Sequence, residues 1–168
     1  KSNELLAHSY SHLYQIPTIG LRFFTVYGPY GRPDMAPMIF IKAILEDKPI
    51  KVFNNGKMKR DFTYIDDIVE GIYRCCYKPV KRENNTGGFC EIAPFKIFNI
   101  GNGKPVDLMD FINLLGKNLN KEVRKEFLPM QKGDVVQTFA CTKFLKEWIN
   151  YSPTTSIDEG IDKFVRWY

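Results

Sequence analysis

Residues 18–27 restrict the fold more than any other part of the sequence, because they form an almost unbroken apolar run, Thr-Ile-Gly-Leu-Arg-Phe-Phe-Thr-Val-Tyr. The run is rich in β-branched and aromatic residues, and a Gly- and Pro-rich segment follows it over residues 28–34. A strand with so little polar alternation is typical of a parallel sheet, in which helices cover both faces. We therefore predict a parallel strand buried on both faces, and an α/β fold.

Helical periodicity is present on both sides of this strand. Residues 3–14 carry an apolar stripe at a spacing of three to four residues, and Pro17 ends the segment. Further helices are expected over 37–47, over 67–77 with Asp66 as N-cap, from an N-cap at Asp107, and from a capping box formed by Ser156 and Glu159. Short strands are expected over 49–53 and 97–100, and a surface loop over 81–94. The pattern lacks the tandem βαβ units of a complete Rossmann domain.

The composition indicates a folded chain with a small-molecule ligand. Of 168 residues, 44% are hydrophobic and 26% are charged, which is typical of a globular protein with a core. No apolar run approaches the roughly 20 residues that cross a bilayer, so we expect no membrane partner. The net charge of +5 is spread along the chain instead of forming a basic stripe with stacking aromatics. We therefore expect a small anionic ligand and no nucleic acid.

The cysteines and histidines argue against a metal site. Four cysteines include no Cys-x-x-Cys pair, and there are two histidines. Reduced thiols and the lack of a secretory signal pattern predict a cytoplasmic protein. The chain opens at Lys1 without an initiator Met or a helix cap, so we expect it to be part of a longer protein.

The segment 21–35 is a candidate site because it joins a strand end to a Gly/Pro loop. Ligands of α/β sheets bind beyond the carboxyl ends of the strands, where Thr25 and Arg32 would hold an anionic group. From spacing alone, Thr25 is equally well explained as a β-branched strand residue, and Arg32 as a surface residue.

Two further segments could contact a ligand. Over 52–64, Arg60 could grip a diphosphate with its forked guanidinium and Phe53 could face a base, or the segment could be a hairpin with solvated charges. Over 131–134, Asp134 could accept hydrogen bonds from a ribose, or the segment could be an ordinary turn. There is no Gly-x-Gly-x-x-Gly, Walker sequence or nucleophile–base pair. Taken alone, the chain is expected to bind a ligand without transforming it.

Five segments in register resemble the extended short-chain dehydrogenase/reductase family of nucleotide-sugar epimerases and dehydratases. They span essentially the whole chain: Lys1–Glu4, Leu21–Pro29, Arg60–Asp67, Phe98–Gly101 and Gly133–Asp134. The first segment is similar to the residues that follow the catalytic Tyr-x-x-x-Lys of the family. The resemblance thus implies that the catalytic pair lies upstream and that this chain holds no catalytic residue.

Within the family, the chain is most similar to the UDP-glucuronate 4-epimerases. The similar stretches are Thr25–Ala36, Met58–Tyr64 and Pro129–Asp134. Galactose-type 4-epimerases usually carry Asn at the position of Thr25. Gln131 stands where many relatives have a phosphate-binding arginine, although glutamine is usual in this subgroup, and Cys141 stands where relatives usually have Asp.

The resemblance implies an NAD-dependent mechanism. NAD, bound mainly by the absent part, removes hydride from C4 of the sugar, and the 4-keto sugar rotates and is reduced on its other face. The implied contacts in this chain are Phe23 beside the nicotinamide, Thr25 and Arg32 on the sugar carboxylate, Arg60 and Gln131 at the diphosphate, Phe53 at the uracil and Asp134 at the ribose.

The same resemblance implies how the parts are organised. Residues 1–30 would be the end of the NAD-binding Rossmann domain, and residues 31–168 would form the substrate-binding domain. The full-length enzyme would be a homodimer that uses the helix over 3–14, and this chain alone would be inactive. Alternatives are a UDP-glucuronate decarboxylase, a 4,6-dehydratase, a 4-epimerase of neutral UDP-sugars, or a UDP-sugar-binding module without catalysis.

Overall fold

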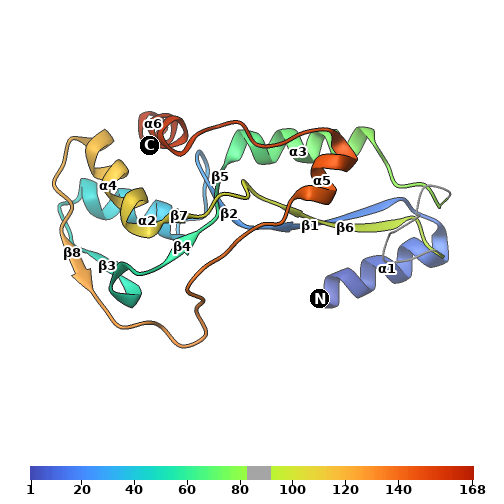
Figure 1. Ribbon diagram of the computed structural model, residues 1–168, viewed down its shortest axis with the longest axis horizontal. Helices are drawn as coiled ribbons and strands as arrows, with labels where there is room; N and C mark the ends of the chain where they lie inside the picture. The colour runs from blue at the N-terminus through green and yellow to red at the C-terminus, as the bar shows by residue number, and fades with distance from the viewer. Residues whose placement is uncertain (83–91) are drawn as a thin grey trace.

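The structure is a computed structural model that describes residues 1–82 and 92–168, and its elements fall into two groups along the long axis (Figure 1). One group holds α1 (Ser2–Tyr14), β1 (Thr18–Phe23), α3 (Ile65–Tyr77), β6 (Phe95–Ile100) and α5 (Lys143–Ile149). The other holds α2 (Ala36–Leu45), β3 (Ile50–Val52), α4 (Leu108–Leu119), β8 (Lys125–Phe127) and α6 (Ile157–Trp167). Between the groups lie β2 (Thr25–Tyr27), β4 (Lys59–Arg60), β5 (Phe62–Tyr64) and β7 (Val106–Asp107), whereas the short helix η1 (Phe53–Gly56) directly follows β3 in the second group.

The apolar run over 18–27 forms two strands instead of one. β1 pairs in parallel with β6, from Thr18 opposite Phe95 to Phe23 opposite Ile100. At Phe24 the chain changes partner, because its N–H still donates to the Ile100 carbonyl (3.2 Å) whereas the next N–H, that of Thr25, donates to the Asp61 carbonyl (3.2 Å). β2 then pairs in parallel with β5. The α/β prediction is confirmed, and so is the parallel pairing.

β1 is less covered than we predicted. Its residues are half-buried or exposed, and within the described residues its second edge has no partner strand. α1 lies on one side of the β1–β6 pair, and α3 and α5 lie on the other (Figure 1). The apolar stripe of α1 is largely uncovered, with Leu6, Tyr10 and Leu13 all more than half exposed.

The second group of elements encloses an aromatic core. Phe62 stacks on Phe111 with ring centroids 4.1 Å apart, and Tyr27 meets both rings edge-on. Phe164 of α6, the last helix of the chain, also packs edge-on against Tyr27. Each such aromatic pair stabilises the fold by roughly 0.5–1.5 kcal/mol beyond the effect of burying its apolar area. The core therefore anchors β2 and β5, which border the pocket described below.

The predicted domain boundary at residue 30 does not coincide with the apolar clusters. One cluster joins Leu21 and Val26 to residues from α3, β6 and α5, so both sides of the boundary contribute to it. The division into two domains stays a prediction. Among the described residues, no helix is long and apolar enough to cross a membrane, and no group of His, Cys, Asp and Glu is placed to hold a metal ion.

The predicted helix starts are partly correct. Ser156 caps α6 by accepting a hydrogen bond from the Glu159 N–H (3.2 Å), as the capping box predicts. Asp107 stands at the N-cap of α4 but makes no side-chain cap, since its carboxylate pairs with Lys59 (3.3 Å). The prediction for Asp66 is wrong, because α3 begins at Ile65, two residues before the predicted start, and Tyr64 stands at the N-cap. The loop predicted over 81–94 lies mostly outside the described residues.

A buried carboxylate, that of Asp61, joins three distant segments. Its Oδ1 accepts a hydrogen bond from the Asn102 N–H (2.9 Å), and its Oδ2 accepts from the N–H groups of Gly103 (3.0 Å) and Ala140 (2.9 Å). The residue is 0% exposed. Burying a charge is costly unless hydrogen bonds replace its hydration, and three backbone donors do so here.

A second carboxylate, that of Asp67, ties the first turn of α3 to the segment that precedes α6. It accepts hydrogen bonds from the Tyr151 hydroxyl (2.7 Å) and from the N–H groups of Thr154 (3.1 Å) and Thr155 (3.0 Å). Burial acts to raise the pKa of Asp67, but these hydrogen bonds outweigh it and the pKa lies below its usual value of 3.8.

We expect Asp61→Ala to lower the free energy of unfolding by about 3–5 kcal/mol, because it leaves one buried and two partly buried backbone N–H groups without an acceptor. Chemical denaturation measures the change. Asp66→Ala, at an exposed acidic residue of the same motif, is the control and should cost less than about 1 kcal/mol. Equal losses in the two variants would contradict the role assigned to Asp61.

We expect Asp67→Asn to destabilise the protein by about 1–3 kcal/mol at neutral pH. A carboxylate whose folded pKa is lowered stabilises the protein above its unfolded pKa, and this contribution is lost as the pH falls through the folded pKa. The difference in free energy of unfolding between wild type and variant should therefore be constant above about pH 5 and should disappear in more acidic solution. Denaturation curves across this range test it, and a gap that persists at low pH would rule it out.

Candidate ligand-binding site

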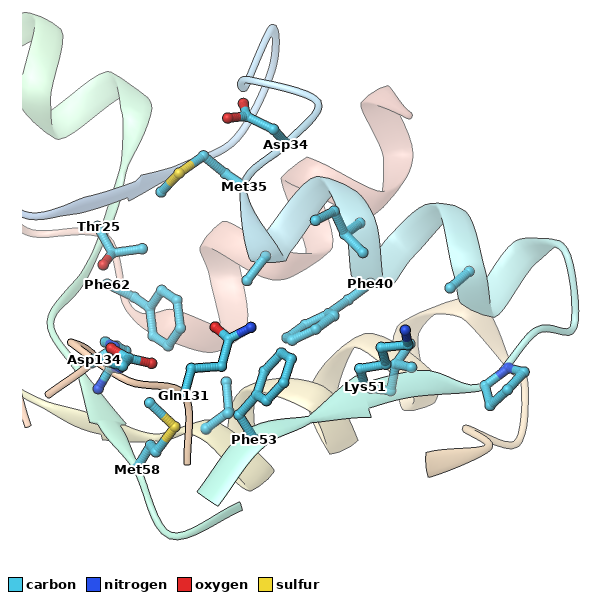
Figure 2. Close-up of a pocket in the computed structure, with 17 residues that line it drawn as sticks. Thr25, Asp34, Met35, Phe40, Lys51, Phe53, Met58, Phe62, Gln131 and Asp134 are labelled. Carbon is cyan, nitrogen blue, oxygen red and sulfur yellow. Dashed lines mark hydrogen bonds and ion pairs between the residues drawn. The ribbon is translucent and has the colours of Figure 1, made fainter. Parts of the chain in front are cut away.

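A cavity of about 640 Å³ opens between α2, β3 and β4, within the size range of small-molecule sites (Figure 2). Figure 2 shows Thr25, Phe62 and Asp134 along one side of the cavity and Phe40, Phe53 and Lys51 along the other. Its walls are mostly apolar, and its charged side chains are Asp34, Lys51, Arg60 and Asp134. A site of this kind suits a ligand with a flat apolar part and an anionic part.

Five residues predicted from separate segments line this one cavity: Thr25, Phe53, Arg60, Gln131 and Asp134. Thr25 begins β2, and Phe53 follows directly after β3. Arg60 ends β4, which pairs antiparallel with β7. The tertiary structure thus collects residues that the sequence holds far apart.

Arg60 is held in place by three acceptors of the protein itself. Its Nη2 donates to the Asp134 Oδ1 (2.8 Å), and its Nη1 donates to the carbonyls of Lys59 (3.0 Å) and Val136 (3.3 Å). The Arg60 side chain is 15% exposed and the Asp134 side chain is 32% exposed. This ion pair was not foreseen, since we assigned the two residues to different parts of a ligand.

A tight turn presents Asp134 to the cavity. The Asp134 N–H donates to the Gln131 carbonyl (3.3 Å), and Gly133 has a φ of 85°. Nothing lies within 4 Å of the place where a Cβ on Gly133 would stand, so glycine is required by the backbone and not by space. The turn therefore depends on a conformation that other residues rarely adopt.

Arg32 does not line the cavity. It lies on the loop after β2, where its Nε and Nη2 donate to the two carboxylate oxygens of Asp34 (3.1 and 2.5 Å). The Arg32 side chain is 73% exposed, whereas Asp34 does line the cavity. Hydrogen bonding to Arg32 lowers the pKa of Asp34, so both groups are charged at neutral pH.

Phe23 is also outside the cavity. It ends β1, and it is 52% exposed. Its position at the carboxyl end of a parallel strand agrees with the place where sheets of this class bind ligands. The structure therefore separates Phe23 from the five residues that share the cavity.

Several lining residues escaped the sequence analysis. Lys51 adds a second cation, and Met58 and Phe62 add apolar wall on either side of Arg60. The one available signal was the alternation over 50–52, where Lys51 is exposed between the buried Ile50 and Val52. Among the described residues that line the cavity there is no Ser, Cys, His or Tyr, and the lining offers a ligand charged groups, hydrogen-bonding groups and apolar surface.

Comparison with known proteins gives matches over more than half of the chain or over its whole length. Residues 2–101 match the NAD dependent epimerase/dehydratase family. The whole chain is 51% identical to Protein CapI of Staphylococcus aureus and covers 52% of it. It is also 47% identical, over its whole length, to a probable UDP-glucuronate 4-epimerase of Rhizobium meliloti, of which it covers 51%. The chain therefore spans about half the length of these curated relatives.

A solved structure matches almost the whole chain. This is the UDP-glucuronic acid 4-epimerase of Bacillus cereus in complex with UDP-glucuronic acid and NAD. The TM-score is 0.82 at 36% sequence identity, with 99% of this chain and 49% of that chain covered. The two proteins share their fold over the region that this chain spans.

We expect Gly133→Ala to lower the free energy of unfolding by about 1–2 kcal/mol, because alanine is strained at this positive φ. Gly133→Asn is the matched variant, since asparagine tolerates the left-handed region better, and it should lose less. Chemical denaturation of the two variants gives the comparison. An alanine variant as stable as wild type would show that the turn does not require the glycine.

Proposed function

The chain belongs to the NAD dependent epimerase/dehydratase family, and on this premise we propose that it is the nucleotide-sugar-binding part of a UDP-glucuronate 4-epimerase. The observation that carries the proposal is that the same cavity is lined by Thr25, Phe53, Arg60, Gln131 and Asp134. A relative and a solved structure named for this activity match over the chain. In the whole enzyme, C4 of the sugar would be oxidised and then reduced on its other face.

The nucleotide is proposed to lie across the cavity. The Arg60 guanidinium faces the diphosphate with a planar fork of donors, and Gln131 adds an amide beside it. Phe53 provides a flat apolar surface for the uracil. Asp134 accepts hydrogen bonds from the ribose hydroxyls through its Oδ2, because its Oδ1 is already bound to Arg60.

The sugar carboxylate is proposed to be held by Thr25 and Arg32. Asp34 now occupies the guanidinium fork of Arg32 with a carboxylate in bidentate geometry. A substrate carboxylate has the same shape and charge, so it could take over this fork while the Thr25 hydroxyl donates a further hydrogen bond. A 4-ketouronate is a β-keto acid that loses CO₂ when the breaking bond aligns with the carbonyl π system. Fixing the carboxylate therefore favours epimerisation over decarboxylation.

NAD is the proposed cofactor, held mainly by a part of the enzyme outside this chain. In this chain, Phe23 at the carboxyl end of β1 is proposed to lie near the nicotinamide and to contribute backbone contacts. When bound, NAD accepts the hydride from C4 and returns it. The residues of this chain supply the binding and orientation of the sugar.

The domain division and the homodimer are part of the same proposal. Residues 1–30 would close the NAD-binding domain and 31–168 would bind substrate. The exposed apolar face of α1 supports a role in association, because Leu6, Leu13 and Tyr14 leave a large hydrophobic surface uncovered.

We expect Arg32→Ala in the full-length enzyme to lower kcat/KM for UDP-glucuronate by roughly 10-fold or more, since a charge-assisted contact to the carboxylate is lost. Binding of UDP-glucose, which has no carboxylate, should change by less than about threefold. Steady-state kinetics and titration calorimetry measure the two effects. Thr25→Val should also lower kcat/KM for UDP-glucuronate, by less than Arg32→Ala does, and should leave binding of UDP-glucose nearly unchanged.

The control for this experiment is Arg166→Ala. Arg166 forms a similarly exposed ion pair with Asp162, and its side chain is 77% exposed on α6. It should leave both UDP-sugars unaffected. If Arg32→Ala weakens UDP-glucuronate and UDP-glucose equally, the carboxylate role is wrong and the assignment to glucuronate loses its physical support.

A further inference from the structure

The two carboxylate oxygens of Asp134 have different surroundings. Oδ1 accepts two hydrogen bonds, from the Arg60 Nη2 (2.8 Å) and from the Val135 N–H (2.8 Å). Within the described part of the chain, Oδ2 accepts none, and the residue lines the cavity. One oxygen is therefore committed to the protein, and the other is available to a ligand.

The donors of Arg60 are divided in the same way. Its Nη1 is engaged by the carbonyls of Lys59 and Val136, and one hydrogen of its Nη2 is engaged by Asp134. A guanidinium has five N–H donors. For residues 1–82 and 92–168, the structure gives no acceptor for Nε or for the second hydrogen of Nη2. Arg60 thus keeps donors for a ligand while its plane is fixed.

The segment that carries Asp134 is attached to the strand that carries Arg60. The Lys59 N–H donates to the Val136 carbonyl (2.9 Å), and the Thr138 N–H donates back to the Lys59 carbonyl (3.2 Å). The Asp61 N–H then donates to the Thr138 hydroxyl (3.0 Å). Asp134 and Arg60 are therefore brought together by hydrogen bonds between their two segments and do not depend on their own side chains alone to meet.

We propose that Asp134 is a positioning residue for Arg60, which holds the guanidinium in the orientation that receives an anionic ligand group. The inference rests on the proposed function for the identity of that group, a diphosphate. Without Asp134, only the carbonyls of Lys59 and Val136 would hold the guanidinium, and the freedom that this leaves to the Arg60 side chain would have to be lost when the ligand binds. Because the ion pair orders the Arg60 side chain when the protein folds, the entropic cost of this ordering does not weaken ligand binding.

A competing view predicts the opposite sign. If Asp134 served the ribose alone, its negative charge would repel the diphosphate, and its removal would leave a ligand without ribose hydroxyls unaffected or more tightly bound. A positioning role predicts weaker binding of that same ligand. The sign of the change in the dissociation constant therefore separates the two views.

The test compares UDP with 2′,3′-dideoxyuridine 5′-diphosphate in calorimetric titrations of the full-length protein. Asp134→Ala should weaken the dideoxy ligand by about 3- to 10-fold, as expected when one long side chain must be ordered on binding. Asp134→Asn should recover most of this loss, because its amide oxygen can still accept from Arg60 and Val135. For UDP it should recover less, since an amide nitrogen replaces the acceptor Oδ2.

A double-mutant cycle adds a second criterion. Arg60→Ala and Asp134→Ala should be non-additive for the dideoxy ligand, because without Arg60 there is nothing for Asp134 to position. Asp107→Ala is the matched control: it removes the neighbouring ion pair with Lys59 (3.3 Å), outside the cavity lining, and should leave both ligands unaffected. Additive losses, or tighter binding in Asp134→Ala, overturn the proposal.

A crystal structure of each variant without ligand keeps the test independent of the proposed function. The Arg60 guanidinium should be ordered in wild type and in Asp134→Asn, and disordered in Asp134→Ala. An unchanged Arg60 in Asp134→Ala overturns the proposal, whatever ligand the protein binds. Failure of wild type to bind UDP would instead refute the proposed function and leave the structural result standing.

Discussion

The buried carboxylate of Asp61 is the interaction on which the rest of the structure depends. Three backbone N–H groups converge on it, from the turn after β6 and from Ala140. A charge in such a place is tolerated only because these donors replace water. The same residue offers its carbonyl to the Thr25 N–H and its own N–H to Thr138. Asp61, which directly follows β4, therefore joins β2, the turn after β6 and the late segment over 138–140.

This junction explains how such short strands can form a site. β2, β4, β5 and β7 contain two or three residues each, too few to be stable as isolated strand pairs. They are held instead by Asp61 on one side and by the aromatic core around Phe62 and Phe111 on the other. Both cavity residues Thr25 and Arg60 are next to Asp61. The Thr25 N–H donates to the Asp61 carbonyl, and Arg60 directly precedes Asp61 in the sequence.

The residue types at the site could be foreseen, whereas their partners could not. Arg60 and Asp134 were selected as polar residues in turn-like contexts, and both line the cavity. Their ion pair depends on the pairing of residues 59–61 with 136–138, a contact between segments some seventy residues apart. Arg32 was equally plausible from its loop, yet its guanidinium is taken by Asp34. The first ion pair joins distant segments, and the second shows that a neighbouring carboxylate can occupy a guanidinium that spacing alone would leave available to a ligand.

The sequence by itself determined the fold class and located most of the helices, although α5 (Lys143–Ile149) and β8 (Lys125–Phe127) were not predicted. Apolar periodicity located the main helices, and the β-rich run over 18–27 predicted parallel pairing, because these patterns reflect local geometry and burial. Only the tertiary structure decided that this run divides at Phe24 and that Asp61 lies in the interior instead of on a surface turn. It also decided that five separate residues share one cavity. The physical reason is that hydrogen-bond partners and ion pairs are set by contacts between distant segments, whereas periodicity reports only which face of each segment is buried.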